Sequence, residues 1–116
     1  MREDASGSLA ASIERAIANE NGGDGIEFEE NASGNQSAAV DRSATDANGQ
    51  DGVEFDENGD GDLTASVSRG SSSSNAVSGL RADQQAPGAG TLALTSLTLA
   101  GYPPGIAVVA AGVTLT

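Results

Sequence analysis

The chain lacks four residue types that carry much of protein chemistry, because it contains no lysine, histidine, cysteine or tryptophan. Without cysteine, disulfides and thiol chemistry are excluded. Without histidine and lysine, the usual bases of catalytic triads and the amines of Schiff bases are missing as well. Carboxylate pairs such as Glu27 and Glu29 fall on the exposed face of an expected strand, where nothing would raise a pKa for acid catalysis. We therefore expect a protein that is not an enzyme.

Charge is absent from the end of the chain. All 17 acidic and all five basic residues lie at or before Asp83, and the net charge is −12. Such an excess of negative charge disfavours binding to a nucleic-acid backbone or to an anionic membrane surface. The acidic front and the uncharged tail are therefore expected to meet different surroundings.

Aromatic residues are scarce, namely Phe28, Phe55 and Tyr102, and large aliphatic residues are sparse before Thr91. A chain of 116 residues is at most one ordinary domain, and this one buries little apolar surface by itself. A partner subunit would supply the missing contacts, so we expect a homo-oligomer. No apolar stretch follows Met1, which predicts synthesis in the cytoplasm without a signal peptide.

The segment 8–19 shows the spacing of an amphipathic helix. Leu9, Ile13 and Ile17 recur every fourth residue and would share one face. We expect a short helix in an N-terminal arm, residues 1–20. This helix would pack on its own domain or dock into a partner's groove.

An internal repeat with a period of 27 residues follows. Residues 21–43 align without gaps to residues 48–70, and twelve of the 23 aligned pairs are identical. Apolar and acidic residues alternate around Phe28 and again around Phe55, as in half-buried strands. A polar loop and a second alternating stretch come next in each copy. The pattern predicts two tandem acidic β-hairpins over residues 21–70.

Residues 71–90 are rich in serine and glycine and are expected to form a linker. Residues 91–116 are expected to form an uncharged pair of strands that reverses at 102–105 and makes the subunit contacts. A membrane span is the alternative for this tail, disfavoured by its two prolines and six threonines. The predicted contact residues of this assembly region are Leu92, Leu94, Leu97, Leu99, Ile106, Val108, Val113 and Leu115.

The stretch 56–64 resembles the first two-thirds of an EF-hand-type calcium loop. Its candidate oxygen ligands alternate along the chain, and they are Asp56, Asn58, Asp60 and Asp62. Gly61 stands where such a loop turns sharply, but the final bidentate glutamate falls on Val67. The resemblance implies weak Ca²⁺ binding; the alternative is an acidic turn without an ion.

Two Asn-x-Ser acceptor sequences begin at Asn31 and Asn35, which makes both residues candidates for glycosylation. Such a modification requires that the protein meets a glycosylation machinery. Because asparagine and serine are common in this chain, coincidence is the alternative.

Abundant acid, no lysine and many small residues make the chain similar to proteins of salt-in halophilic archaea. The fold class expected is mainly β, assembled as an oligomeric β-sandwich or β-barrel-like structure. At the level of class, the chain resembles small structural proteins of haloarchaeal tailed viruses, such as head decoration, tail or fibre accessory subunits. That resemblance implies a virion location, with itself and other virion proteins as partners, no nucleic acid and no membrane. The alternative is a surface or appendage component of a halophilic cell.

Overall fold

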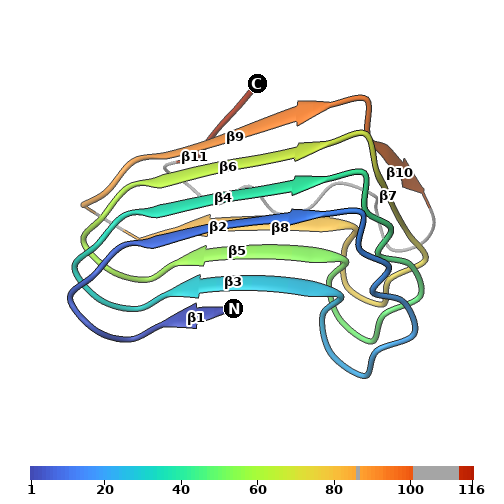
Figure 1. The fold of residues 1–116 in the computed structure, drawn as a ribbon, viewed down its shortest axis with the longest axis horizontal. Coiled ribbons are helices and arrows are strands. Elements are labelled where there is room, and N and C mark those ends of the chain that lie inside the picture. The colour runs from blue at the N-terminus through green and yellow to red at the C-terminus, as the bar shows by residue number, and fades with distance from the viewer. Residues whose placement is uncertain (86, 101–112) are drawn as a thin grey trace.

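The structure is a computed structural model that describes residues 1–85, 87–100 and 113–116 (Figure 1). Its regular structure consists of short strands, and the described residues contain no helix. The strands are β1 (Arg2–Glu3), β2 (Leu9–Glu14), β3 (Ile26–Glu30), β4 (Gln36–Asp41), β5 (Val53–Glu57), β6 (Leu63–Ser68), β7 (Ser71–Ser73), β8 (Leu80–Gln84), β9 (Gly90–Thr95), β10 (Thr98–Ala100) and β11 (Val113–Leu115).

All strand pairs are parallel, and they form three sheets. Sheet A has the order β1-β3-β5-β8, sheet B has the order β11-β9-β6-β4-β2, and sheet C pairs β10 with β7. Between successive strands the register is 27 residues, as in Phe28 beside Phe55 and Val40 beside Val67. β11 departs from this, because its Val113 lies beside Gly90. The strands of sheets A and B run in opposite directions and stack coil upon coil (Figure 1). The fold is therefore a parallel β-solenoid with a 27-residue coil.

The core lies between the facing sides of the sheets. Phe28 and Phe55 are completely buried, and their rings stack in parallel with centroids 5.3 Å apart. The alternation predicted for these strands is confirmed, since Ile26 and Phe28 point inward while Glu27 is exposed. The core residues are Leu9, Ile26, Phe28, Ala38, Val40, Val53, Phe55, Leu63, Ala65, Val67, Leu80, Ala82 and Leu92.

The predicted hairpins are wrong. β3 does not pair with β4 but with β5, and β4 pairs with β6, one coil further on in each case. Both copies of the repeat thus place the same residue types side by side in neighbouring coils. An antiparallel sandwich or barrel does not form either, because every pairing in the described residues is parallel.

The predicted N-terminal helix is also wrong, and β2 occupies the middle of that segment. Leu9 is buried in the core, whereas Ile17 is 80% exposed, so the two residues do not share a buried face. The residues Leu9, Ala11 and Ile13 also fit a strand period of two. The neighbouring strand β4 decides between the two periods, because it pairs with β2 along its whole length.

The segment 71–90, which we expected to be a linker, contains β7 and β8. Leu80 and Ala82 on β8 are buried in the core, at 1% and 0% exposure. The segment therefore completes a coil that corresponds to residues 44–63 in the preceding repeat.

The uncharged tail begins as a further coil of the solenoid. β9 continues sheet B, and a corner at Ser96, whose φ is 52°, separates it from β10. The expected reversal at 102–105 and most of the second expected strand lie outside the described residues. β11 pairs with β9 in parallel. No helix among the described residues is long and apolar enough to cross a membrane.

A column of asparagines fixes one corner of the solenoid. Asn48 donates through its backbone N–H and its Nδ2 to Oδ1 of Asn75, at 2.9 and 3.0 Å. Asn21 donates to Oδ1 of Asn48 in the same way. Asn48 and Asn75 are both 2% exposed, so their amides satisfy backbone groups inside the fold that water cannot reach. This column locks neighbouring coils at the 27-residue register.

Candidate functional site

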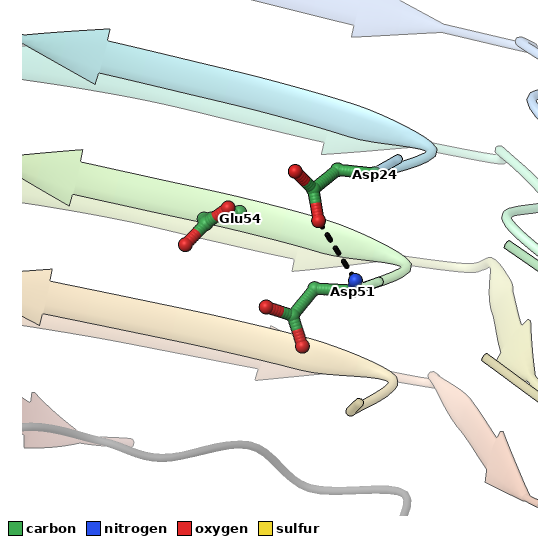
Figure 2. A group of neighbouring side chains, drawn as sticks. All are labelled: Asp24, Asp51 and Glu54. Carbon is green, nitrogen blue, oxygen red and sulfur yellow. Dashed lines mark hydrogen bonds between the residues drawn. The ribbon is translucent and has the colours of Figure 1, made fainter. Parts of the chain in front are cut away.

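Three carboxylates from two neighbouring coils converge at the start of sheet A. Asp24 and Asp51 precede β3 and β5 at equivalent positions, and Glu54 lies on β5 (Figure 2). Their ligand oxygens all lie within 4.8 Å of one another. Asp51 and Glu54 are buried, at 2% and 6% exposure. Hard oxygen ligands gathered in this way are of the type that binds Ca²⁺ or Mg²⁺.

Donors from the chain itself already contact each of these carboxylates. Asp24 Oδ1 accepts the backbone N–H of Asp51 at 2.7 Å (Figure 2). Asp51 Oδ1 accepts the hydroxyl of Ser78, and Glu54 Oε1 pairs with Nη1 of Arg81 at 2.6 Å. The residues Asp24, Asp51 and Ser78 are 27 residues apart, so the group forms another column that joins three coils. A cation would have to compete with Arg81 for Glu54.

Burial dominates the electrostatics of this group. It raises the pKa of Glu54 to about 8, helped by the negative charges of Asp56 and Asp24 and opposed by Arg81. The pKa of Asp56 is raised by burial as well. The folded state thus holds a proton on Glu54 that the unfolded chain releases near pH 4.5. Its contribution to stability is full below that pH and is lost as the pH rises towards about 8.

The residues of the predicted calcium loop are spread along a corner of the solenoid. Asp56 lies on β5, and Asp60 and Asp62 are exposed in the turn before β6. Asn58 donates through Nδ2 to Asn31 Oδ1 at 2.9 Å, and Asp62 Oδ1 accepts the N–H of Ala89 at 2.8 Å. These side chains are thus engaged with neighbouring coils. In the part of the chain that the structure describes, the acidic residues that converge are those around Glu54 instead. Ca²⁺ binding at 56–62 stays a prediction.

Both glycosylation candidates take part in hydrogen bonds between coils. Asn31 is half-buried and donates through Nδ2 to Asp4 Oδ1 at 2.9 Å. Asn35 is exposed, and its Oδ1 accepts the N–H of Asp62 at 2.9 Å. The Nδ2 atom that glycosylation would modify is therefore occupied in Asn31. Glycosylation of either residue stays a prediction.

The predicted assembly residues take different positions. Leu92 is completely buried in the chain's own core, and Leu115 is 45% exposed. Ile106 and Val108 lie outside the described residues. The remaining four are partly buried against the core, and they are Leu94, Leu97, Leu99 and Val113. The apolar side chains of β9 thus complete the solenoid before they can contact a partner.

Three of the five arginines stack along one corner, beside a groove of about 390 Å³. Arg15, Arg42 and Arg69 are 27 residues apart, and each has a positive φ, which non-glycine residues adopt at a cost. Arg42 pairs with Glu14 at 2.7 Å, and Arg69 donates through Nε to Asp41 at 2.8 Å. The bonds from Arg69 and Ser68 hold the pKa of Asp41 at about 2. The arginines thus pair with acids of the preceding coil, which neutralises most of the groove.

The columns between coils are the feature that motif reading missed, because every column joins residues far apart in sequence. The signal was nevertheless present in the spacing. Gly7, Gly34, Gly61 and Gly88 recur every 27 residues, as do the arginine and asparagine columns. The repeat therefore extends to both sides of the two copies that sequence comparison identified.

The parallel β-solenoid is the class of protein that fold and columns define. No known protein family, curated protein or solved structure matches this chain. Its function must therefore be argued from its own residues.

Proposed function

We propose that the protein is a non-enzymatic structural subunit of a virus particle of a halophilic archaeon, and that copies of the chain associate through the end of the solenoid. The acidic, lysine-free composition supports a high-salt environment. Recovery of the chain with purified virus particles, and not with cell envelopes, tests the particle assignment.

The open strand edge of the first coil carries the proposal. β2 pairs with β4 on one side, and no strand among the described residues covers its other side. The N–H of Arg15 bonds to Asp41 O, and N–H groups alternate in direction along a strand. The N–H of Ser12 therefore points away from β4, towards the open edge. An unpaired edge of this kind is a template for a strand from another copy, unless something covers it.

Asparagine positions at this end also match the register of an added coil. Asn21 donates to Asn48, as Asn48 does to Asn75, so Asn21 Oδ1 takes the place that accepts from a further coil in the other two. Asn21 is exposed. A second copy seated on this edge would extend both the sheet and the column.

Proline at Ser12 is expected to abolish association while leaving the fold intact. The substitution removes an N–H that faces the open edge and no hydrogen bond to β4. Light scattering coupled to size-exclusion chromatography should show oligomers for the native chain and monomers for Ser12→Pro. Ser12→Ala is the matched control and should assemble normally. Unchanged stoichiometry of Ser12→Pro would contradict contact through this edge.

Stability is expected to rise with salt. The net charge of −12 makes the folded chain repel itself in dilute buffer. The Debye length falls from about 10 Å at 0.1 M to about 3 Å at 1 M, which screens repulsion between exposed carboxylates. Thermal unfolding monitored by circular dichroism should give a melting temperature that increases into the molar range. A flat or falling melting temperature would remove the halophilic inference.

A further inference from the structure

The last residue of each strand in sheet A points into the solenoid and forms a column of acids. Glu3, Glu30, Glu57 and Gln84 are successive register partners. Glu30 and Glu57 are completely buried, and Gln84 is 4% exposed. Three coils therefore carry a carboxyl group where the next coil carries an amide of nearly the same shape.

The amide in this column has all its hydrogen bonds. Gln84 Oε1 accepts the N–H of Leu63 at 2.7 Å. Its Nε2 donates to the carbonyls of Gly61 and Gln85, at 2.9 and 2.8 Å. The corner thus accommodates a side chain with one accepting end and one donating end.

The carboxyl groups of the column lack the donating end. Glu3, Glu30 and Glu57 each accept, through Oε1, the backbone N–H two residues further on, at 2.8–2.9 Å. The Oε2 atom of each is buried without a partner, and so is Oε1 of the completely buried Gln36. These unpartnered atoms are all acceptors, so the feature that is missing is a donor.

We propose that Glu57 binds a proton at neutral pH and that its O–H group supplies this missing donor. By the 27-residue register, Oε2 of Glu57 corresponds to Nε2 of Gln84, and Gly34 O corresponds to Gly61 O. A protonated Oε2 can donate to such a carbonyl, as the amide does. An ionised Oε2 would face acceptors only, without water, and that arrangement is unfavourable.

The surroundings of Glu57 favour its neutral form. Glu30 lies beside it from β3, Gln84 from β8 and Gln36 from β4, and Glu3 follows beyond Glu30. None of the arginines, all of which are described, forms an ion pair with a carboxyl of this column. Burial, followed by the neighbouring carboxyl of Glu30, raises the pKa of Glu57 to about 7.

The sign of the pH dependence follows from this proton. The folded state binds it up to about pH 7, and the unfolded chain releases it near pH 4.5. Its stabilising contribution is therefore full below pH 4.5 and decreases as the pH rises through 7. Alkaline conditions should loosen the corner between sheets A and B.

The experiment compares Glu57→Gln with the native side chain. Both are measured in a Glu54→Gln background, because Glu54 titrates with the same sign. Denaturant midpoints between pH 5 and pH 9 should fall for Glu57 and stay level for Glu57→Gln, whose amide mimics the protonated acid. Glu27→Gln, at an exposed position of sheet A, is the matched control and should keep the fall. Infrared spectra at neutral pH should show a protonated-carboxyl band that Glu57→Gln loses.

Two results would overturn the proposal. One is an equal fall of the midpoints with and without Glu57. The other is a midpoint that drops when divalent cations are removed, together with a less stable Glu57→Gln, because that result would place a metal ion in the column. If Glu57→Gln does not fold, absence of the protonated-carboxyl band from the Glu54→Gln protein at neutral pH is decisive by itself.

Discussion

Alanine at Gly61 is expected to destabilise the solenoid severely, by about 3 kcal/mol or more, whereas alanine at Gly7 should be tolerated. A Cβ at Gly61 would lie 1.5 Å from the carbonyl oxygen of Gly34 in the preceding coil. Backbone atoms cannot yield as a flexible side chain does, so the two coils would have to separate. The corresponding fall in melting temperature is roughly 10 °C or more.

Gly7 is the matched control because it occupies the same turn in the first coil. No coil precedes it, and its added Cβ would meet only Glu3, at an ordinary 3.6 Å. Gly22, with no atom within 4 Å of the added Cβ, is a second control. Thermal melts of the three alanine variants test the difference. Equal losses at Gly61 and Gly7 would contradict the close stacking of the turns.

Replacement of Phe55 by alanine is expected to remove about 3–5 kcal/mol of unfolding free energy. Its ring is completely buried and stacked on Phe28, so truncation leaves a cavity and removes the ring contact. Domains of this kind have about 5–15 kcal/mol in total, and the variant should therefore be close to unfolding.

The control for this prediction is Val77→Ala, because Val77 is 52% exposed. It should change stability by no more than about 0.5 kcal/mol. Denaturant unfolding followed by circular dichroism measures both variants. A loss below about 1 kcal/mol for Phe55→Ala would mean that the stacked rings are not at the centre of the core.

Sequence patterns identified the strands better than their partners. Alternation around Phe28 and Phe55 determines which side chains face inward, but it does not say which strand lies alongside. We assumed the nearest neighbour in sequence, as in a hairpin. The repeat itself held the alternative, because in-register stacking places identical residues together at a spacing of 27. For residues 8–19 the apolar spacing fitted both a helix and a strand, and pairing with β4 settled it.

The candidate site was less accessible to sequence reasoning. The calcium-loop resemblance relied on residues close together in the chain, such as Asp56 and Asp60. The acids that converge in space, Asp24, Asp51 and Glu54, come from two coils. The buried column at Glu57 was also hidden, because an acid at the end of an amphipathic strand is normally solvated. Inward direction at these positions depends on the next turn, which alternation alone does not specify.

The constant register has a consequence for how such a chain can change in length. Each inner coil presents to the next coil the same turn glycine and the same inward positions that it received from the one before. Duplication of any 27-residue segment would therefore insert a complete coil whose two surfaces already fit their neighbours. A gain or loss of one residue within a strand would instead turn its inward side chains outward. Selection on such a gene should accept whole periods and reject fractions of them.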